Sequence, residues 1–189
     1  MNETKEHILI SSLKLFLQKS YKEVTMREIV EITGLSKGAF YHHFSSKEEL
    51  FKDIARMFFS MGVIDYSSFD QGSLYSFYNH YVKYIGESFK EMYRLLGDSV
   101  DVSFNFFLIM FEAVAKFPEF LKMELAQHEK SIEAWEQVIQ SADEKGEIKS
   151  TSTNNHIAAL FLYCTDGVFL RFVNNQKKST YEADLKVAF

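Results

Sequence analysis

The segment 36–47, SKGAFYHHFSSK, gathers the side chains of this sequence that are best suited to chemistry. It holds two lysines, two adjacent histidines, a tyrosine and no carboxylate, although the whole chain has a formal net charge of −5. Adjacent helical residues point about 100° apart, so His42 and His43 are badly placed to bind one metal ion, and the segment offers no carboxylate or cysteine to complete a site. We therefore predict no metal site here and expect a surface for a negatively charged partner.

Helix-start and helix-end signals precede this segment. Apolar residues at i, i+4 and i+8 spacing predict an amphipathic helix over 4–19. Thr25 followed by Glu28 has the pattern of a capping box, and Gly34 suits the left-handed residue that ends a helix. These signals predict a short helix over 26–33, directly before the basic segment.

The basic segment itself contains two further helix starts. Ser36 is a good N-cap for a helix over 37–43. Ser46 with Glu49 predicts another capping box and the start of a helix with one apolar face. Two short helices joined by a few residues, with one helix before and one after them, form a helix-turn-helix. The spacing of these signals therefore predicts this DNA-binding motif.

The segment 25–50 resembles the DNA-binding domain of TetR-family transcriptional regulators. The residues that carry the resemblance are Thr25, Ile29, Gly34, Ser36, Gly38, Phe40, Tyr41, His43, Phe44, Lys47 and Leu50. One departure is Ser20, where the family often has glycine. The resemblance implies a helix-turn-helix DNA-binding domain over 1–48 and a helical ligand-binding and dimerisation domain over 49–189. It also implies a homodimer that binds operator DNA in the major groove and releases it when a ligand changes the spacing of the two DNA-binding domains.

Several residues of this domain are expected at the DNA. Lys37 can reach a phosphate or a guanine edge, and Tyr41 suits a phosphate or a thymine methyl group. Phe40 and Phe44 share one helical face and should pack inward. Gly38 either lets the backbone approach DNA or the preceding helix, or is a neutral surface glycine. The complete set of predicted DNA-binding residues is Thr25, Arg27, Ser36, Lys37, Gly38, Ala39, Tyr41, His42, His43 and Lys47.

The distribution of charge is compatible with DNA binding. Residues 1–60 hold nine Lys and Arg against eight Asp and Glu, whereas residues 61–189 hold twelve against eighteen. Salt screens charges separated by more than about a Debye length, so a locally basic surface can bind DNA on an acidic chain.

Composition predicts an all-α protein in a reducing compartment. Proline occurs once and glycine eight times in 189 residues, too few for many hairpins. The amino terminus, MNETKEH, lacks the pattern of a secretory signal, and apolar runs such as 157–164 fall short of the roughly 18 residues that span a bilayer. The single cysteine, Cys164, permits no internal disulfide and fits a buried apolar position. We expect a soluble, cytoplasmic protein without a cofactor.

The carboxy-terminal part is unusually aromatic. Its segment 104–111, FNFFLIMF, has apolar groups all round and should be a helix buried on all sides. Most of the rings in 66–117 should form ordinary core, and some are expected to line an apolar cavity for a small hydrophobic or aromatic effector. The predicted ligand-binding residues are Tyr78, Tyr81, Phe104, Phe107, Phe111 and Glu112. If Glu112 faces the cavity, a cationic ligand becomes plausible.

Two long helices are expected to form the dimer interface. Helices over 119–145, with Pro118 at the start, and 154–174 carry more apolar surface than one monomer needs to bury, which suits a four-helix interface. The alternative is that 154–174 is the central helix of a monomeric bundle. The predicted interface residues are Leu125, Ile132, Trp135, Phe161, Val168 and Phe172. The end, 180–189, resembles the start of a further helix.

The motifs favour a regulator, most simply a repressor, over an enzyme. The sequence has no Gly-rich phosphate loop, HExxH, GxSxG or paired-carboxylate motif. The main alternative is a helical-bundle enzyme or small-molecule carrier that uses the aromatic cavity. A protein-interaction module with a vestigial helix-turn-helix is a third possibility, and it would lack the steep loss of DNA affinity with salt that a regulator shows.

Overall fold

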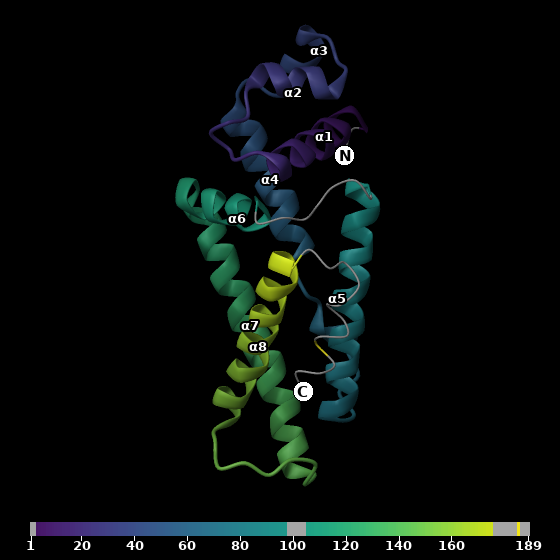
Figure 1. The fold of residues 1–189 in the computed structure, drawn as a ribbon. Coiled ribbons are helices and arrows are strands. Elements are labelled where there is room, and N and C mark those ends of the chain that lie inside the picture. The colour runs from purple at the N-terminus through teal and green to yellow at the C-terminus, as the bar shows by residue number, and fades with distance from the viewer. Residues whose placement is uncertain (1–2, 98–104, 176–184, 186–189) are drawn as a thin grey trace. The chain divides into compact units, whose positions relative to one another are not determined.

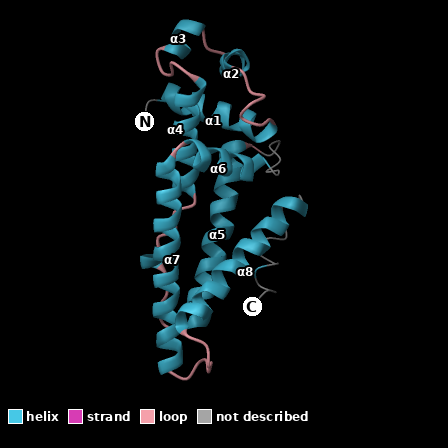
Figure 2. Ribbon diagram, turned by 90° about the vertical axis from the view of Figure 1, so that its left-hand side faces the viewer, coloured by secondary structure: helices cyan, strands magenta, loops and turns pink. Residues whose placement is uncertain are grey.

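The computed structural model describes residues 3–97, 105–175 and Leu185 (Figure 1). Among these residues the structure consists of helices joined by loops and turns, which confirms the all-α prediction (Figure 2). The helices are α1 (Glu3–Gln18), α2 (Met26–Thr33), α3 (Lys37–Tyr41), α4 (Lys47–Met61), the short 3₁₀ helix η1 (Tyr66–Ser68), α5 (Leu74–Leu96), α6 (Asn105–Lys116), α7 (Pro118–Glu144) and α8 (Asn154–Asn175). The predicted helix start in 180–189 lies outside the described residues except for Leu185.

The described chain divides into two compact units. The first comprises the described residues of 1–62 and 92–123, and the second those of 63–91 and 124–189. The helix-turn-helix and α6 therefore belong to one unit, and α8 belongs to the other. Helices α5 and α7 contribute residues to both.

The core of the first unit joins α6 to the helices around the helix-turn-helix. Helix α6 packs against α1 and α4. Aromatic pairs extend this core, including Phe58 with Phe106, whose ring centroids are 4.4 Å apart. The prediction that 104–111 is buried on all sides is wrong for the described residues, because Phe111 is 58% exposed and projects from a helix that buries Phe107 and Ile109.

The core of the second unit is built around Trp135 of α7, whose side chain is fully buried. Its ring centroid lies 4.9 Å from that of Phe77 on α5 and 4.8 Å from that of Phe161 on α8. Helix α7 ends at Glu144, shortly before Gly146, whose φ of 72° is left-handed, and α8 then runs in the opposite direction (Figure 1). Cys164 is exposed on α8. The prediction that it is buried is wrong, because the core takes the neighbouring face of the helix.

Candidate nucleic-acid interface

Buried rings anchor the short helix α3 to the first unit. Phe40 is fully buried and Phe44 is 1% exposed, and both join the core that contains Ile29 and Leu50. Ring centroids of Phe40 and Phe44 lie 6.3 Å apart. The prediction that these two rings face inward is confirmed, so the remaining face of α3 is left for solvent.

The ends of α2 follow the sequence signals closely. The Thr25 hydroxyl accepts a hydrogen bond from the backbone N–H of Glu28, and the Glu28 carboxylate accepts one from the backbone N–H of Thr25 at 2.8 Å. Gly34 ends the helix with a φ of 67°. The predicted capping box and left-handed end are both confirmed.

The ends of α3 and the start of α4 differ in detail from prediction. Ser36 caps α3 through Ala39 N–H, and α3 ends at Tyr41, earlier than predicted. Ser46 caps α4 through the N–H of Glu49, but the Glu49 carboxylate accepts from the backbone N–H and hydroxyl of Ser45. The second capping box is therefore only half formed, because Ser45 offers Glu49 two donors at once.

The exposed face of α3 carries most of the predicted DNA-binding residues. Lys37, Gly38, Ala39 and His42 are exposed, and Tyr41 is 47% exposed. A cation, a phenol and an imidazole thus lie on a solvent-facing helical surface without a carboxylate, as expected of a surface that meets phosphates and base edges.

The two histidines have different surroundings. His42 is exposed and His43 is half-buried. Their ring centroids lie 5.3 Å apart, with the ring planes 72° from parallel. Among the described residues, no group of three His, Cys, Asp or Glu side chains could hold a metal ion.

Gly38 stands in open space. A Cβ added at this position would meet no atom within 4 Å, so the glycine does not serve close packing against the preceding helix. Glycine in a helix is less favourable than alanine by about 1 kcal/mol. Of the interpretations open from the sequence, the approach to another molecule and the neutral surface glycine remain.

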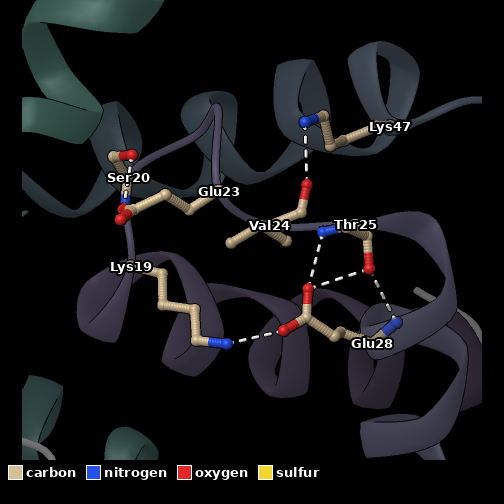
Figure 3. A network of polar contacts seen from close by, with 7 residues as sticks. All are labelled: Lys19, Ser20, Glu23, Val24, Thr25, Glu28 and Lys47. Carbon is tan, nitrogen blue, oxygen red and sulfur yellow. Dashed lines mark hydrogen bonds and ion pairs between the residues drawn. The ribbon is translucent and has the colours of Figure 1, made fainter.

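A network of polar contacts fixes the turn between α1 and α2 (Figure 3). Lys19 donates to the Glu28 carboxylate at 2.5 Å, which links the end of α1 to α2. The hydrogen bond from Lys19, together with those from the backbone and hydroxyl of Thr25, lowers the pKa of Glu28 to about 2. Ser20 donates to the Glu23 carboxylate through both its N–H and its hydroxyl. The sequence signals identified Glu28 as a capping residue but did not indicate its ion pair with Lys19.

Lys47 is directed into this turn. Its ammonium group donates to the carbonyl oxygens of Tyr21 and Val24, each at 2.8 Å, and is half-buried. Burial lowers its pKa. The Lys47 ammonium group therefore supports the turn within the protein, and the phosphate contact expected from its position stays a prediction.

The other predicted DNA-binding residues lie at the start of α2. Arg27 is exposed and pairs with Glu31 one turn along the helix, with Nε 2.8 Å from the carboxylate. Thr25 is exposed, but its hydroxyl already donates to Glu28 as well as accepting from it. Because an exposed ion pair is weak, Arg27 can exchange Glu31 for a phosphate at little cost.

The structure places the predicted ligand-binding residues in both units. Tyr78 and Tyr81 lie against Trp135 in the second unit, with ring centroids 6.4 and 5.4 Å from it. Phe107 and Phe111 stack in the first unit, where Glu112 pairs with Lys116. Phe104 lies outside the described residues.

The predicted dimer residues also separate into groups. Trp135 is fully enclosed by its own chain, and Phe161 stacks on it. Ile132 packs against the same core and Val168 is half-buried. Leu125 is 51% exposed. The side chain of Phe172 lies outside the described residues.

A different row of apolar residues on α8 is exposed. Leu160 and Tyr163 are each 59% exposed and Leu170 is 47% exposed. Their spacing of three and seven residues places them on one helical face. Sequence reasoning missed this row because both neighbouring faces of α8 are apolar, so periodicity alone could not show which one the core uses.

These features define a helical protein with an exposed helix-turn-helix, and comparisons with known proteins agree. Residues 8–54 match the family described as "Bacterial regulatory proteins, tetR family". Over 63 residues the chain is 43% identical to the uncharacterized HTH-type transcriptional regulator YerO of Bacillus subtilis, a match that covers 33% of this chain and 22% of YerO. It is 40% identical over 53 residues to the HTH-type transcriptional repressor AcnR of Corynebacterium efficiens, covering 28% of each chain.

Two comparisons extend over most of the chain. The uncharacterized HTH-type transcriptional regulator YfiR of Bacillus subtilis is 25% identical over 174 residues, which are 87% of this chain and 81% of YfiR. The crystal structure of the MbdR regulator from Azoarcus sp. CIB superposes with a TM-score of 0.61 at 20% identity, covering 98% of this chain and 96% of MbdR. The fold is therefore that of tetR-family proteins. Residues 8–54 therefore match the DNA-binding domain of the tetR family, and the relatives named above are transcriptional regulators, in agreement with the prediction of a regulator in preference to an enzyme.

Among the described residues, no helix is long and apolar enough to cross a membrane.

Proposed function

We propose that this protein is a cytoplasmic transcriptional repressor that binds operator DNA as a homodimer and releases it when a small hydrophobic effector binds. The surface of α3 carries the DNA-binding part of the proposal. Lys37, Tyr41 and His42 are exposed on a helix that Phe40 and Phe44 hold in place. A helix of this kind fits the major groove, where side chains read base edges. The name of the relative AcnR supports repression as the sign of regulation.

A titration with DNA selected from a random pool tests this part. The double variant Lys37→Ala and Tyr41→Ala should bind the selected DNA more weakly in gel-shift titrations while remaining folded. Affinity of the wild-type protein should fall steeply as salt rises, because phosphate contacts release counterions. Lys149→Ala is the matched control, because it removes the same charge from an exposed position in the second unit. An unchanged affinity of the double variant would refute the assignment of α3.

The exposed row on α8 supports the dimer. Leu160, Tyr163 and Leu170 present large apolar groups to solvent on one face of a long helix, and such a surface marks an interface. An isologous contact between two copies covers the same row on both. We therefore assign this row, in preference to Trp135 and Phe161, to the homodimer interface, and retain Leu125 as an exposed residue of α7.

Buried polar atoms in the second unit support an effector site there. Gln127, Ser131 and Trp135 recur every fourth residue on α7, so they share one face. The Tyr66 hydroxyl donates to Ser131 at 3.1 Å, whereas Nε2 of Gln127 and Nε1 of Trp135 are buried without a hydrogen-bond partner among the described residues. A buried donor without an acceptor costs about 1–3 kcal/mol, which a ligand with an acceptor oxygen would relieve.

The surroundings of these buried polar atoms indicate which chemical type of ligand would fit. Burial raises the pKa of the Tyr66 hydroxyl, and the neighbouring polar groups of Ser131 and Trp135 partly offset that rise. The indole N–H of Trp135 therefore lies near this hydroxyl, although the two do not form a hydrogen bond. An effector that combines apolar rings with an acceptor group fits this environment.

Fluorescence offers a direct test of the effector site. Trp135 is the single tryptophan of the chain and lies in the core of the second unit, so its emission reports on this unit alone. Compounds that raise the melting temperature should also change Trp135 emission and weaken DNA binding. Compounds that bind without weakening DNA binding would contradict the effector role.

A further inference from the structure

Tyr21, in the turn between α1 and α2, has two ammonium groups over its ring. Nζ of Lys47 lies 4.3 Å from the ring centroid, and Nζ of Lys116 lies 4.6 Å from it. Lys47 is the first residue of α4 and Lys116 is the last residue of α6. The face of an aromatic ring attracts cations, and more strongly where water is partly excluded. The ring therefore connects the ends of two helices that are far apart in the sequence.

The two cations interact with each other and with one carboxylate. Burial lowers the pKa of Lys47, and the charge of Lys116 lowers it further, whereas Glu112 acts in the opposite direction. The Glu112 carboxylate lies 3.7 Å from Nζ of Lys116, one helical turn away. Two like charges near one ring repel, so the ring and the Glu112 carboxylate must together offset that repulsion.

Lys47 connects this ring to the turn from which α2 of the helix-turn-helix starts. Its ammonium group donates to the carbonyl oxygens of Tyr21 and Val24. Figure 3 shows the bond to Val24, which immediately precedes Thr25, the N-cap of α2. Phe16 of α1 and Phe51 of α4 pack against the Tyr21 ring, and their ring centroids lie 6.0 and 4.7 Å from its centroid. The turn from which α2 starts is thus held at the same ring that Lys116 contacts.

We propose that Tyr21 and Lys116 are positioning residues for DNA binding, through which α6 holds the helix-turn-helix in its DNA-competent arrangement. Neither side chain needs to touch DNA. Helix α6 lies in the same compact unit as α1–α4 and packs against α1 and α4, so a shift of α6 would act on the Tyr21 ring directly. The inference rests on the proposed DNA-binding function and adds the contact by which α6 controls it.

The variant Lys116→Met tests the contact, because it removes the ammonium group and keeps an unbranched side chain. We expect operator affinity to fall about fivefold for each DNA-binding domain, or roughly 25-fold for the dimer, as expected for one cation–π contact. Lys116→Arg should restore affinity, because a guanidinium also binds a ring face. Tyr21→Phe, which keeps the ring, should bind as the wild type does.

The matched control is Lys52→Met. Nζ of Lys52 lies 5.3 Å from the centroid of Phe117 and 2.6 Å from the Glu119 carboxylate, within the same unit. This variant removes the same charge and a similar contact, but the contact is with Phe117 instead of Tyr21. We expect it to keep operator affinity close to that of the wild type.

A second readout separates positioning from a general loss of structure. In Lys116→Met, the pKa of Lys47 measured by NMR titration should rise toward its ordinary value, because the Lys116 charge lowers it in the wild type. Equal affinities of Lys116→Met and Lys52→Met, or an unchanged pKa of Lys47, would overturn the inference. Absence of DNA binding by the wild-type protein would instead refute the proposed function.

Discussion

Replacing Gly38 with alanine should make the free protein more stable and its DNA complex weaker. A Cβ at this position meets no atom within 4 Å, so the substitution introduces no clash in the free protein. Alanine is favoured over glycine in a helix by about 0.5–1 kcal/mol, and the free energy of unfolding should rise by a similar amount. If the backbone approaches DNA here, the added methyl group costs about 1 kcal/mol or more in each of two domains, which lowers affinity about 30-fold.

Urea unfolding and a fluorescence-anisotropy titration with operator DNA measure the two effects on the same preparation. Ser60→Ala is the control, because Ser60 is exposed on α4 in the same unit and alanine is also the better helix former. The control should not lose affinity. A Gly38→Ala protein that is stabilised and binds DNA as tightly as the wild type would show that Gly38 is a neutral surface glycine and refute the close approach.

Three further results are expected. Hydrogen-bonding partners hold the pKa of Glu28 at about 2, so its contribution to stability is present above its ordinary pKa of 4.5 and is lost as the pH falls from 4.5 to about 2; in urea unfolding across this window Glu28→Gln should lose less stability than the wild type, and equal losses would contradict the assignment. Phe40→Ala should destabilise the protein by about 3–5 kcal/mol in urea, whereas Tyr41→Ala should change stability by only about 0.5 kcal/mol, because only the first ring is buried. Tyr163→Lys should shift sedimentation toward the monomer, whereas Tyr75→Lys, at a position 75% exposed on α5, should not; equal sedimentation of the two variants would remove α8 from the interface.

The sequence was most informative where structure depends on neighbours along the chain. The capping box of Thr25 and Glu28 and the left-handed Gly34 involve residues a few positions apart, and each formed as predicted. The inward direction of Phe40 and Phe44 followed from helical spacing in the same way. These local signals place α2 and α3 and leave the outer face of α3 exposed, so the candidate DNA-binding surface could be located before the structure was known.

Contacts between distant segments could not be predicted in this way. Nothing near Lys47 in the sequence indicates that its ammonium group binds carbonyl oxygens of the α1–α2 turn. Glu112 was a candidate ligand residue because aromatic residues surround it in the sequence, but its carboxylate faces Lys116 on its own helix. Trp135 was expected at the dimer interface because it lies on an apolar face, and that face packs on Phe77 and Phe161 of its own chain.

The central claim is that the outer face of α3 is the surface that binds DNA. Hydrogen exchange of the full protein, alone and with selected operator DNA, tests it most directly. We expect DNA to slow exchange in residues 36–47 and to leave exchange in residues 154–175 unchanged, because the first segment lies at the DNA and the second at the proposed dimer interface. Slower exchange in another part of the chain, with 36–47 unaffected by bound DNA, would contradict it.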